Sequence, residues 1–590
     1  MSGSACDFVI VTGDAFVDHP AFGSAVIARV LHDAGYRVGI IAQPDWHGPE
    51  PFRALGRPRL GFAITAGNVD SMLANYSPTF QRRRRDDYAP GGRFGLRPNR
   101  ATTVYANRCR EAYPDAPLII GGVEASLRRL AHYDFREDRV RPSLLTDTRA
   151  DILVYGMGER ATLEIAGRLA AGEMLEDIPG TCTIGPEPPA GDALFLPSFE
   201  DTARSPDAFN KAHRLFAGEA DRPRGRVLVQ PHGDRYVTHR PMPAPMTAAE
   251  LDRIYELPYT RAAHPHYAEP VPALEPVRFS ITSHRGCLGS CSFCSLRAHQ
   301  GRIIQWRSEQ SLIREAEGLT RLPGFHGHIT DVGGPTVNMY GATCAKMKRG
   351  EVCADRECTW PEKCSSLRLG YDRQLSVLAA IRRLPGVKKV SVGTGLRFDL
   401  LDGPAGESYL AQLCRHHISG QLRVAPEHVA PAVLKQMRKA PPDSYRRFRN
   451  EFRAANRRLG LRQFLVPYFI AGHPGATIDD AVALAEHLVR EEKFFIRRVQ
   501  QFTPLPMTAA AAAWYTGKDP LTGRAVHVAR DPAEARLQRS LLQLWVPANY
   551  ARAERELVRL GRADLLRRIR ALRPLLARED EKPRLPRGRA

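Results

Sequence analysis

The chain has 590 residues, of which 43% are hydrophobic and 25% are charged, and its formal net charge is +21. A chain of this length does not fold around a single core, so we expect two to four domains. Its composition excludes a disordered or fibrous protein, and no apolar run is long enough to cross a bilayer.

Residues 1–185 alternate between short apolar stretches and helices, which predicts an N-terminal doubly wound α/β domain. A helix is expected over residues 21–34, where the apolar side chains share one face and Gly35 follows. The first apolar stretch has no basic segment ahead of it and is predicted to be a strand rather than a signal peptide, which favours a cytoplasmic protein without membrane contact. The expected strands are residues 8–12, 38–42, 61–65, 118–121, 152–155 and 182–184.

Residues 186–270 are rich in proline, arginine and acidic residues, and only residues 226–230 and 236–238 form a weak strand pair. We expect this segment to be a linker that wraps one domain onto the next.

Residues 271–510 repeat an apolar strand, a loop of small residues and a helix six times. This alternation predicts parallel strands with right-handed crossovers in a partial (βα)6 barrel, whose chemistry lies at the carboxyl ends of the strands. The expected strands are residues 277–283, 328–332, 389–392, 421–424, 463–470 and 498–502. The candidate cofactor-binding residues at their ends are Gly333, Gly334, Pro335, Gly395, Arg397, Glu427, Gly472 and His473.

Three cysteines, Cys287, Cys291 and Cys294, follow the first of these strands in a short loop. Their thiolates can each hold a different iron of a 4Fe–4S cluster, which four thiolates normally complete. The fourth iron would then be open to a small molecule. S-adenosylmethionine (SAM) chelates such an iron, and reductive cleavage of its C–S bond yields a 5′-deoxyadenosyl radical. Gly286 and Gly289 suit the sharp bends that wrapping a cluster requires.

Two other interpretations of these cysteines remain open from spacing alone. A zinc ion could be bound by the same three residues with His299 or His284 as the fourth ligand. The cysteines could also be unconnected buried thiols, because free cysteine is often a small core residue.

A second group of cysteines, Cys344, Cys353, Cys358 and Cys364, lies in a loop rich in lysine, arginine and proline. The loop has little apolar content, so a metal cross-link would give it order. Four thiolates could hold zinc or a second 4Fe–4S cluster, and the spacing does not decide between them. Independent reduced thiols are the alternative.

After residue 506 the alternation ends, and residues 511–573 are predicted to form a small helical region. Residues 574–590 have the composition of a frayed basic tail. Positive charge gathers at residues 82–85 and from residue 567 onward, which permits contact with nucleic acid but also suits a solvated surface.

The central module resembles the radical SAM core, and the chain from Asp7 to about Leu566 resembles the YgiQ-type radical SAM family. The matching segments are the cysteine loop and residues 11–20, 41–46, 121–129, 155–160, 333–336 and 425–428. This resemblance implies a 4Fe–4S cluster, SAM and a one-electron donor such as a flavodoxin or ferredoxin. The family's substrate is not established, so the substrate is unknown and RNA is one candidate.

Two positions depart from related patterns. Many radical SAM enzymes have Gly-Gly-Glu after the second strand, whereas Pro335 stands here in place of the glutamate. Some relatives carry an N-terminal cobalamin domain with Asp-x-His-x-x-Gly, whereas Asp18 and His19 are adjacent here and Gly23 is one place too far. Cobalamin is therefore predicted to be unlikely, and His19 is expected at the edge of the substrate site.

Two functions follow from these observations. The first is a radical SAM enzyme that acts on an unidentified substrate. The alternative is a non-catalytic protein in which the cysteines hold zinc and whose positive charge permits association with nucleic acid.

Overall fold

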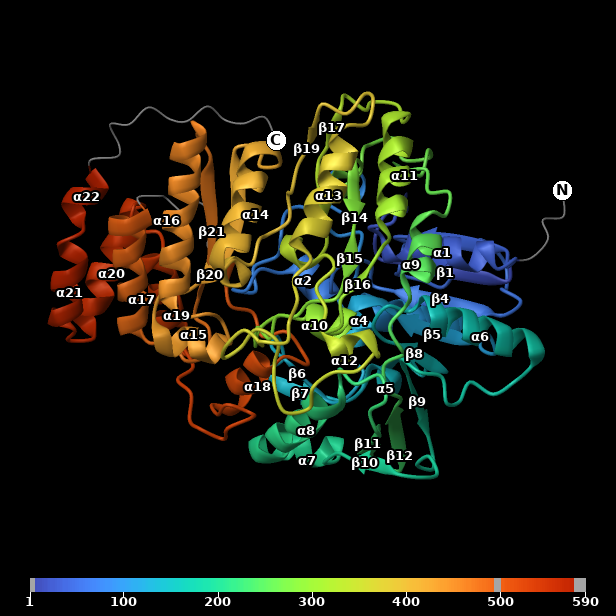
Figure 1. The fold of residues 1–590 in the computed structure, drawn as a ribbon. Coiled ribbons are helices and arrows are strands. Elements are labelled where there is room, and N and C mark those ends of the chain that lie inside the picture. Colours follow the sequence, from blue (N-terminus) through green and yellow to red (C-terminus); the bar gives the residue numbers. More distant parts are fainter. Residues whose placement is uncertain (1–5, 493–499, 578–590) are drawn as a thin grey trace.

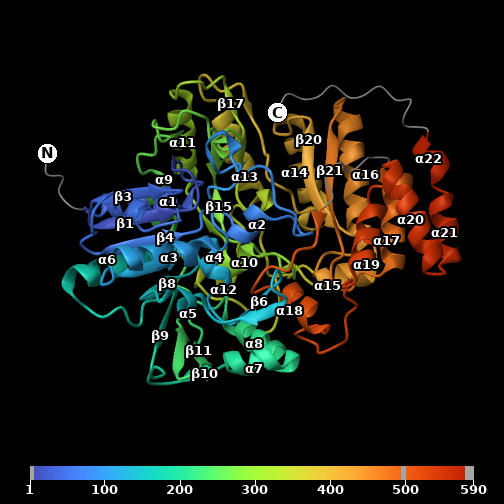
Figure 2. The ribbon, with the colours of Figure 1, turned by 180° about the vertical axis from the view of Figure 1, so that it is seen from behind.

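The structure is a computed structural model that describes residues 6–492 and 500–577. A nine-stranded sheet lies at one end of the molecule, a module of parallel strands and helices forms the middle, and helices from the last part of the chain form the other end (Figure 1). The view from behind shows the same arrangement (Figure 2). The predicted mixed α/β fold is thus confirmed. The start of the predicted sixth strand, residues 498–499, and most of the basic tail lie outside the described residues.

Five parallel strands build the first part of the nine-stranded sheet, in the order β3-β1-β4-β5-β8. Phe8 of β1 packs with residues of α1 and α6, whereas its neighbour Val9 packs with residues of α3 on the opposite face. Helices on both faces make the sheet doubly wound, and the strand order reverses beside β1. The bounds are β1 Phe8–Thr12, β3 Val38–Ala42, β4 Gly61–Thr65, β5 Leu118–Gly121, β8 Ile152–Val154, α1 Gly23–Asp33, α3 Ala101–Ala112 and α6 Glu159–Ala171.

Smaller elements connect these strands. They are β2 Val17–Asp18, α2 Ser71–Asn75, α4 Gly122–Leu127, the hairpin β6 His132–Asp134 and β7 Arg139–Arg141, and α5 Leu144–Thr148.

The structure differs from the predicted linker over residues 186–270. The chain extends the sheet in the order β8-β9-β12-β11-β10, so the N-terminal domain continues to residue 239. Leu228 and Val237 are fully buried in its core. Most proline and charged residues of the segment lie outside these strands, so the overall composition concealed them. The bounds are β9 Thr181–Gly185, β10 Ala193–Phe195, α7 Phe199–Arg204, α8 Pro206–Glu219, β11 Val227–His232 and β12 Arg235–His239. Residues 240–270 cross to the next module with α9 Ala248–Tyr255 and β13 Ala262–Ala263.

The middle module has six parallel strand positions in chain order. β14 (Ser280–Thr282) pairs with β18 (Asp331–Gly333), β17 (His328–Ile329) with β19 (Lys389–Val390), and β20 (Gln421–Glu427) with β21 (Phe464–Ala471). A parallel bridge between Leu396 and Val424 joins the third position to the fourth, and β21 pairs with β22 (Gln500–Gln501). Within the described ranges β14 and β22 do not pair with each other, so the strands form an open arc.

Helices cover the outer face of this arc. Ser308 caps the first long one, as predicted, because its side chain accepts a hydrogen bond from the Ser311 N–H. One core lies between the strands and these helices, and it includes Ile281, Val332, Val390 and Val424. The alternate residues of the strands face the inside of the arc. The bounds are α11 Glu309–Thr320, α13 Tyr371–Arg382, α14 Gly403–His416, α15 Pro431–Met437, α16 Pro442–Leu459 and α17 Ile478–His487.

The last part of the chain is helical, with α18 Ala509–Thr516, α19 Pro532–Leu541, α20 Pro547–Arg559, α21 Ala563–Arg570 and α22 Arg573–Ala577. α18 packs on α8 of the N-terminal domain, where the rings of Tyr515 and Phe209 meet. α19, α20 and α21 share a core with α17. In the described part of the chain, no helix combines the length and apolar character needed to span a bilayer.

Candidate functional site

The cysteine loop, residues 283–294, leaves the carboxyl end of β14 and is held by neighbouring backbone. Its first residues form a short ladder, β15 (His284–Arg285), with β16 (Gln305–Trp306). Gly286 then adopts a φ of +87°, and a side chain there would collide with the carbonyl of Ile303. Gln300, the last residue of α10 (Leu296–Gln300), accepts a hydrogen bond of 3.1 Å from the Gly286 N–H. The positive φ and the close Ile303 carbonyl therefore require glycine at position 286, where the sequence predicted a bend.

The three cysteines share a half-buried site with one arginine. Arg397 donates from Nη1 to Cys291 Sγ at 3.8 Å, and the absence of a side chain at Gly289 leaves room for its guanidinium. Burial raises the pKa of the Cys294 thiol to about 12. Loss of this proton therefore requires a cation beside the sulfur. Iron is suited to supply that positive charge at Cys294, whereas Arg397 supplies it beside Cys291.

The histidines proposed as zinc ligands are engaged elsewhere. His284 has hydrogen bonds at both ring nitrogens, from Nδ1 to Ser283 Oγ at 2.9 Å and from Nε2 to the Thr336 carbonyl at 3.1 Å. His299 is bonded through Nδ1 to Ser126 of α4 at 2.9 Å. In the described ranges, no group of three or more His, Cys, Asp or Glu side chains is arranged to hold a single metal ion.

Gly333 ends β18 and Gly334 follows it, directly beside the cysteine loop. The Gly333 carbonyl accepts a 2.7 Å hydrogen bond from the Ser283 N–H, and a side chain at Gly334 would come within 2.6 Å of the His284 ring. The Gly395 carbonyl accepts from the Val337 N–H at 3.1 Å, which ties the loop after the third strand to the same place. The structure therefore brings these predicted glycines together around the base of the cysteine loop.

Glu427 occupies an unusual position at the end of β20. Its φ is +68°, in the left-handed region that non-glycine residues rarely adopt, and the β20–β21 register shifts at this point. Its side chain is buried, and Oε2 has no hydrogen-bond partner among the described residues. Lys439 Nζ lies 3.9 Å from Oε1. Burial raises the pKa of Glu427, while Lys439 and Arg397 act against this shift. Strain and an unpaired buried oxygen at one residue are typical of a ligand-binding position.

Gly472 and His473 follow β21 on the far side of the cysteine loop. Gly472 has a φ of +71°, with open space where a side chain would lie. His473 Nε2 lies 3.3 Å from Ser292 Oγ, between two of the cysteines, and its ring meets Phe293 edge to face at 5.7 Å. Its Nδ1 is bonded to the Pro474 carbonyl at 2.7 Å. His473 therefore supports the loop that carries Cys291 and Cys294.

The second group of cysteines is better ordered than the sequence suggested. Cys344, Cys358 and Cys364 pack, together with Cys287, around an apolar cluster that includes Leu288, Met339, Met347 and Leu367. The Cys364 N–H donates to the Cys358 carbonyl at 3.0 Å. The prediction that this loop cannot order itself by burial is wrong, because hydrophobic side chains from both flanks of the loop and from the cysteine loop complete its core.

Buried charge fixes the same segment. Glu357 pairs with Arg297 of α10 at 2.7 Å and with Arg302 at 3.3 Å, and the Cys353 carbonyl accepts from Arg302 at 2.7 Å. The cysteine-rich segment is thus attached to the helix that follows Cys294.

A cavity of about 580 Å³ separates the two modules. One wall is the carboxyl edge of the N-terminal sheet, including Gly67, Gly121 and Gly156, and the other is the inside of the strand arc, including Thr282 and Asp331. Gly333, Gly334 and Pro335 also line it, whereas Arg397, Glu427, Gly472, His473 and the three cysteines do not. The predicted site residues therefore divide into a group around the cysteine loop and a group on the cavity wall.

His19 does not line this cavity. It is buried, with Nδ1 accepting from the Ala21 N–H at 3.0 Å and Nε2 lying 3.0 Å from Arg261 Nη1. Its ring therefore holds the β2 loop to the crossing segment, and a place for His19 at the edge of a substrate site stays a prediction.

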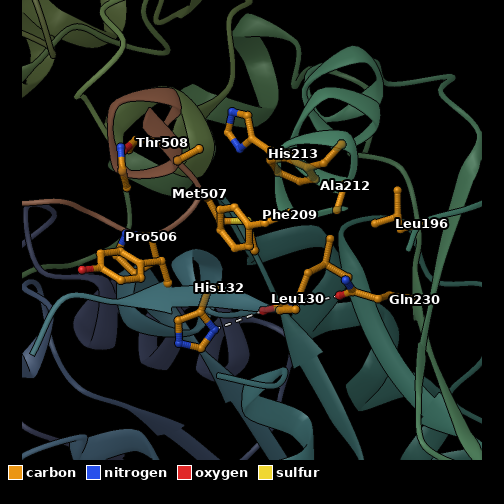
Figure 3. A pocket seen from close by; sticks show the side chains of 15 residues that line it. Leu130, His132, Leu196, Phe209, Ala212, His213, Gln230, Pro506, Met507 and Thr508 are labelled. Atoms are coloured by element: carbon orange, nitrogen blue, oxygen red, sulfur yellow. Dashed lines mark hydrogen bonds between the residues drawn. The ribbon is translucent and has the colours of Figure 1, made fainter. Parts of the chain in front are cut away.

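A much smaller cavity of about 30 Å³ lies between α8 and the β6 hairpin (Figure 3). Phe209, His213, Met507 and His132 are among its lining residues, and the His132 ring is bonded to the Leu130 carbonyl at 3.1 Å. Its volume suits ordered water rather than a substrate.

Several residues at the site were not singled out from the sequence. Thr336 Oγ1 lies 4.0 Å from Cys287 Sγ, Asp399 forms a buried pair with Arg397, and Lys439 faces Glu427. Thr336 directly follows the Gly-Gly-Pro segment, which gave a sequence signal for it. Asp399 and Lys439 gave none, because their partners are defined only by the tertiary fold.

Acid should destabilise the site. Burial lowers the pKa of His284 to about 4 and that of His473 to about 3. The unfolded chain, with histidine pKa near 6.5, therefore binds more protons below that pH, and stability falls as the pH drops from about 6.5 toward 4. For His284 the loss at pH 5 is about 2 kcal/mol. The melting temperature measured between pH 8 and pH 5 tests this loss of stability. A melting temperature that stays constant as the pH is lowered from 6.5 to 5 would contradict it.

Comparison with known proteins identifies relatives over almost the whole chain. The family model "Radical SAM N-terminal" matches residues 2–280, ending where β14 begins, and a domain of unknown function (DUF3362) matches residues 497–581. A UPF0313 protein of Methanocella arvoryzae is 47% identical over 95% of this chain and 94% of the relative. A UPF0313 protein of Methanosarcina acetivorans is 46% identical over 95% of this chain and 79% of the relative.

Solved structures with a similar chain trace are more distant. The radical SAM methyltransferase TsrM from Kitasatospora setae is 15% identical, with a TM-score of 0.46, over 82% of this chain and 70% of its own. The cobalamin-dependent radical SAM enzyme OxsB is 10% identical, with a TM-score of 0.47, over 88% and 57%. TsrM has been solved with cobalamin and a [4Fe-4S] cluster bound, and OxsB with aqua-cobalamin bound. For the present chain, the expectation that cobalamin is unlikely stays a prediction. On the strength of its full-length relatives, the chain belongs to the UPF0313 family, the YgiQ-type family of radical SAM proteins.

Proposed function

We propose that this protein is an enzyme in which Cys287, Cys291 and Cys294 hold a 4Fe–4S cluster that leaves one iron for SAM. The observation that carries this proposal is the fixed three-cysteine loop at the carboxyl end of β14, with Arg397 beside a thiol and with His284 of the same loop bonded at both ring nitrogens. When bound, the reduced cluster supplies one electron that breaks the C–S bond of SAM, giving methionine and a 5′-deoxyadenosyl radical that removes hydrogen from a substrate.

The residues around the loop have separable tasks in this proposal. Arg397 offsets thiolate charge, and Asp399 holds the guanidinium in place. Gly333 and Gly334 offer backbone without side chains beside the loop. Glu427 is the acid that Pro335 does not provide, because its unpaired, buried oxygen suits an ammonium or hydroxyl donor of SAM. Gly395, Gly472 and His473 shape the surroundings of that site.

Formation of 5′-deoxyadenosine under anaerobic conditions tests this function. Protein reconstituted with iron and sulfide, reduced with dithionite and supplied with SAM should release 5′-deoxyadenosine and methionine in equal amounts. A protein that binds four irons yet forms no 5′-deoxyadenosine, even slowly in the absence of substrate, would contradict the proposal. The same chemistry needs a one-electron donor in the cell, for which a flavodoxin or ferredoxin is suited.

The second cysteine group is proposed to hold another metal centre. Cys344, Cys358 and Cys364 share one apolar cluster, and Cys353 is fixed nearby by Arg302. Burial raises the pKa of Cys358 to about 11, so a bound cation would favour its thiolate. Because these cysteines lie next to Cys287, a metal centre held by them would be at the mouth of the SAM site.

Replacing Cys344, Cys353, Cys358 and Cys364 together with serine should lower the bound metal and leave the first cluster intact. Metal analysis should show about four fewer irons per chain for a 4Fe–4S centre, or about one fewer zinc ion. The electron paramagnetic resonance signal of the SAM-bound first cluster should persist. An unchanged metal content would show that these four residues are ordinary thiols packed in a hydrophobic cluster.

A further inference from the structure

The cavity between the two modules has the position of a substrate site. It lies at the carboxyl edge of the doubly wound sheet, where ligands of such domains bind, and it reaches Gly333 and Gly334 beside the cysteine loop. Its volume of about 580 Å³ falls within the range of small-molecule pockets. A ligand there would contact both modules at once.

The charged side chains on the wall of this cavity are already paired. Arg285 lies 2.6 Å from Glu159 Oε1 through Nη1 and donates from Nε to the Tyr255 hydroxyl at 3.0 Å. Asp331 accepts from the Gly393 N–H at 2.8 Å and from the Thr394 hydroxyl. The wall thus has one cation and two carboxylates, and the lone cation is neutralised by Glu159. A phosphate placed in the cavity would find no free positive partner and would lie near the Asp331 carboxylate.

The two histidines on the wall add no positive charge. Burial lowers the pKa of both His284 and His299 to about 4, so each ring is neutral at pH 7. This leaves the cavity neutral to weakly acidic, in contrast to the positive charge of the whole chain.

His299 offers the clearest directional contact. The Ser126 hydroxyl donates to the Gly122 carbonyl at 2.8 Å and accepts from the Gly156 N–H at 3.0 Å. The hydroxyl proton of Ser126 is thus used in the bond to Gly122. In the 2.9 Å contact, His299 must therefore be the donor, with its ring proton on Nδ1. In a neutral ring Nε2 is then a hydrogen-bond acceptor, and it has no partner among the described residues.

Resting on the proposed function, we infer that the cavity binds the substrate, a small neutral or cationic organic molecule without a phosphate. An N–H or O–H group of this molecule donates to His299 Nε2. The glycines at the ends of β4, β5 and the segment after β8 let the molecule lie against the backbone of the sheet. Because α10 carries His299 and also fixes the cysteine loop through Gln300, the ligand is positioned relative to the radical source by one short helix.

A matched set of fragments tests this inference without any SAM cleavage. Tyramine, tyrosol and 4-hydroxyphenylacetate share a phenol donor and differ in charge from positive through neutral to negative. Ligand-observed NMR with the reconstituted full chain should show tyramine and tyrosol binding with Kd values on the order of millimolar. The anion 4-hydroxyphenylacetate should bind at least about tenfold more weakly, because the cavity has no free cation.

Variants at His299 locate the binding. His299→Leu should weaken tyramine and tyrosol about fivefold through the lost hydrogen bond. His299→Gln, which keeps an acceptor, should restore most of the affinity. His299→Leu should have little effect on 4-ethylanisole, which has a similar aromatic ring but no N–H or O–H donor. His32→Leu, at an exposed position outside the cavity, serves as the control.

Three results would overturn the inference: equal binding of the anion, unchanged affinities in His299→Leu, or displacement of tyramine by an RNA hairpin. The last result would favour a nucleic-acid substrate whose base enters the cavity. Failure to form 5′-deoxyadenosine would contradict the proposed function but would leave these binding results standing, so the two outcomes are separable.

Discussion

Replacing Cys291 with alanine should abolish 5′-deoxyadenosine formation and remove the iron of the first cluster. Each of the three thiolates binds its own iron in the proposed centre, and His284, which lies in the same loop, is bonded at both ring nitrogens and cannot replace a lost thiolate. Cys287→Ala and Cys294→Ala should behave in the same way. Iron content, absorbance near 400 nm and anaerobic 5′-deoxyadenosine yield measure the effect.

Cys6→Ala is the matched control for these variants, because Cys6 is also half-buried but lies at the start of β1, far along the chain from the loop. It should retain the iron and the activity of the unchanged protein. Turnover at the original rate in any of the three loop variants would show that the cysteine concerned holds no iron needed for SAM cleavage.

Glu159→Gln should destabilise the attachment of the cysteine loop to the N-terminal domain. Glu159 in the first turn of α6 pairs with Arg285, two residues before Cys287, and both side chains are only 4% exposed. Removing one partner of a buried ion pair leaves the other charge uncompensated, at a cost of about 3–5 kcal/mol. Hydrogen exchange of the peptide that spans residues 284–294 should accelerate accordingly, and the reconstituted protein should hold less iron.

Two further variants separate charge from general damage. Glu164→Gln lies on the same helix, in a pair with Arg168 whose glutamate is 51% exposed, and should change stability by no more than about 0.5 kcal/mol. The double variant Glu159→Leu with Arg285→Met removes both charges and should recover much of the lost protection. If the loop peptide exchanges hydrogen at the same rate in Glu159→Gln and Glu164→Gln, the buried pair does not hold the loop.

Much of the fold follows from local sequence patterns. The strand bounds of β1, β3, β4 and β5 agree with the apolar stretches that predict them, and Ser308 caps its helix as its residue type and position indicate. The six strand positions of the middle module and the placement of the cysteine loop after the first of them could also be predicted. These features depend on periodicity, capping and chain order, which are present in the sequence itself.

Other features depend on contacts between distant residues and could not be predicted. The apolar residues at 226–230 and 236–238 indicated the β11–β12 pair, but the proline and charge around it suggested a linker. Strand β10 and the pairing of β12 with β9, which joins this pair to the sheet, depend on distant residues. The strained backbone of Glu427 and its partner Lys439 are likewise products of tertiary structure. The cavity has walls from both modules, and the role of His299 depends on Ser126, which is 173 residues away.

The most direct test of the central claim is electron–nuclear double resonance of the reduced protein with SAM labelled by ¹⁷O in the carboxylate and ¹⁵N in the amino group. If three cysteines hold the cluster and SAM chelates the remaining iron, both labels should show hyperfine coupling to the cluster, and the Cys344, Cys353, Cys358, Cys364 quadruple serine variant should show the same coupling. A reduced cluster whose spectrum is unchanged by SAM and shows coupling to neither label would contradict the proposed function.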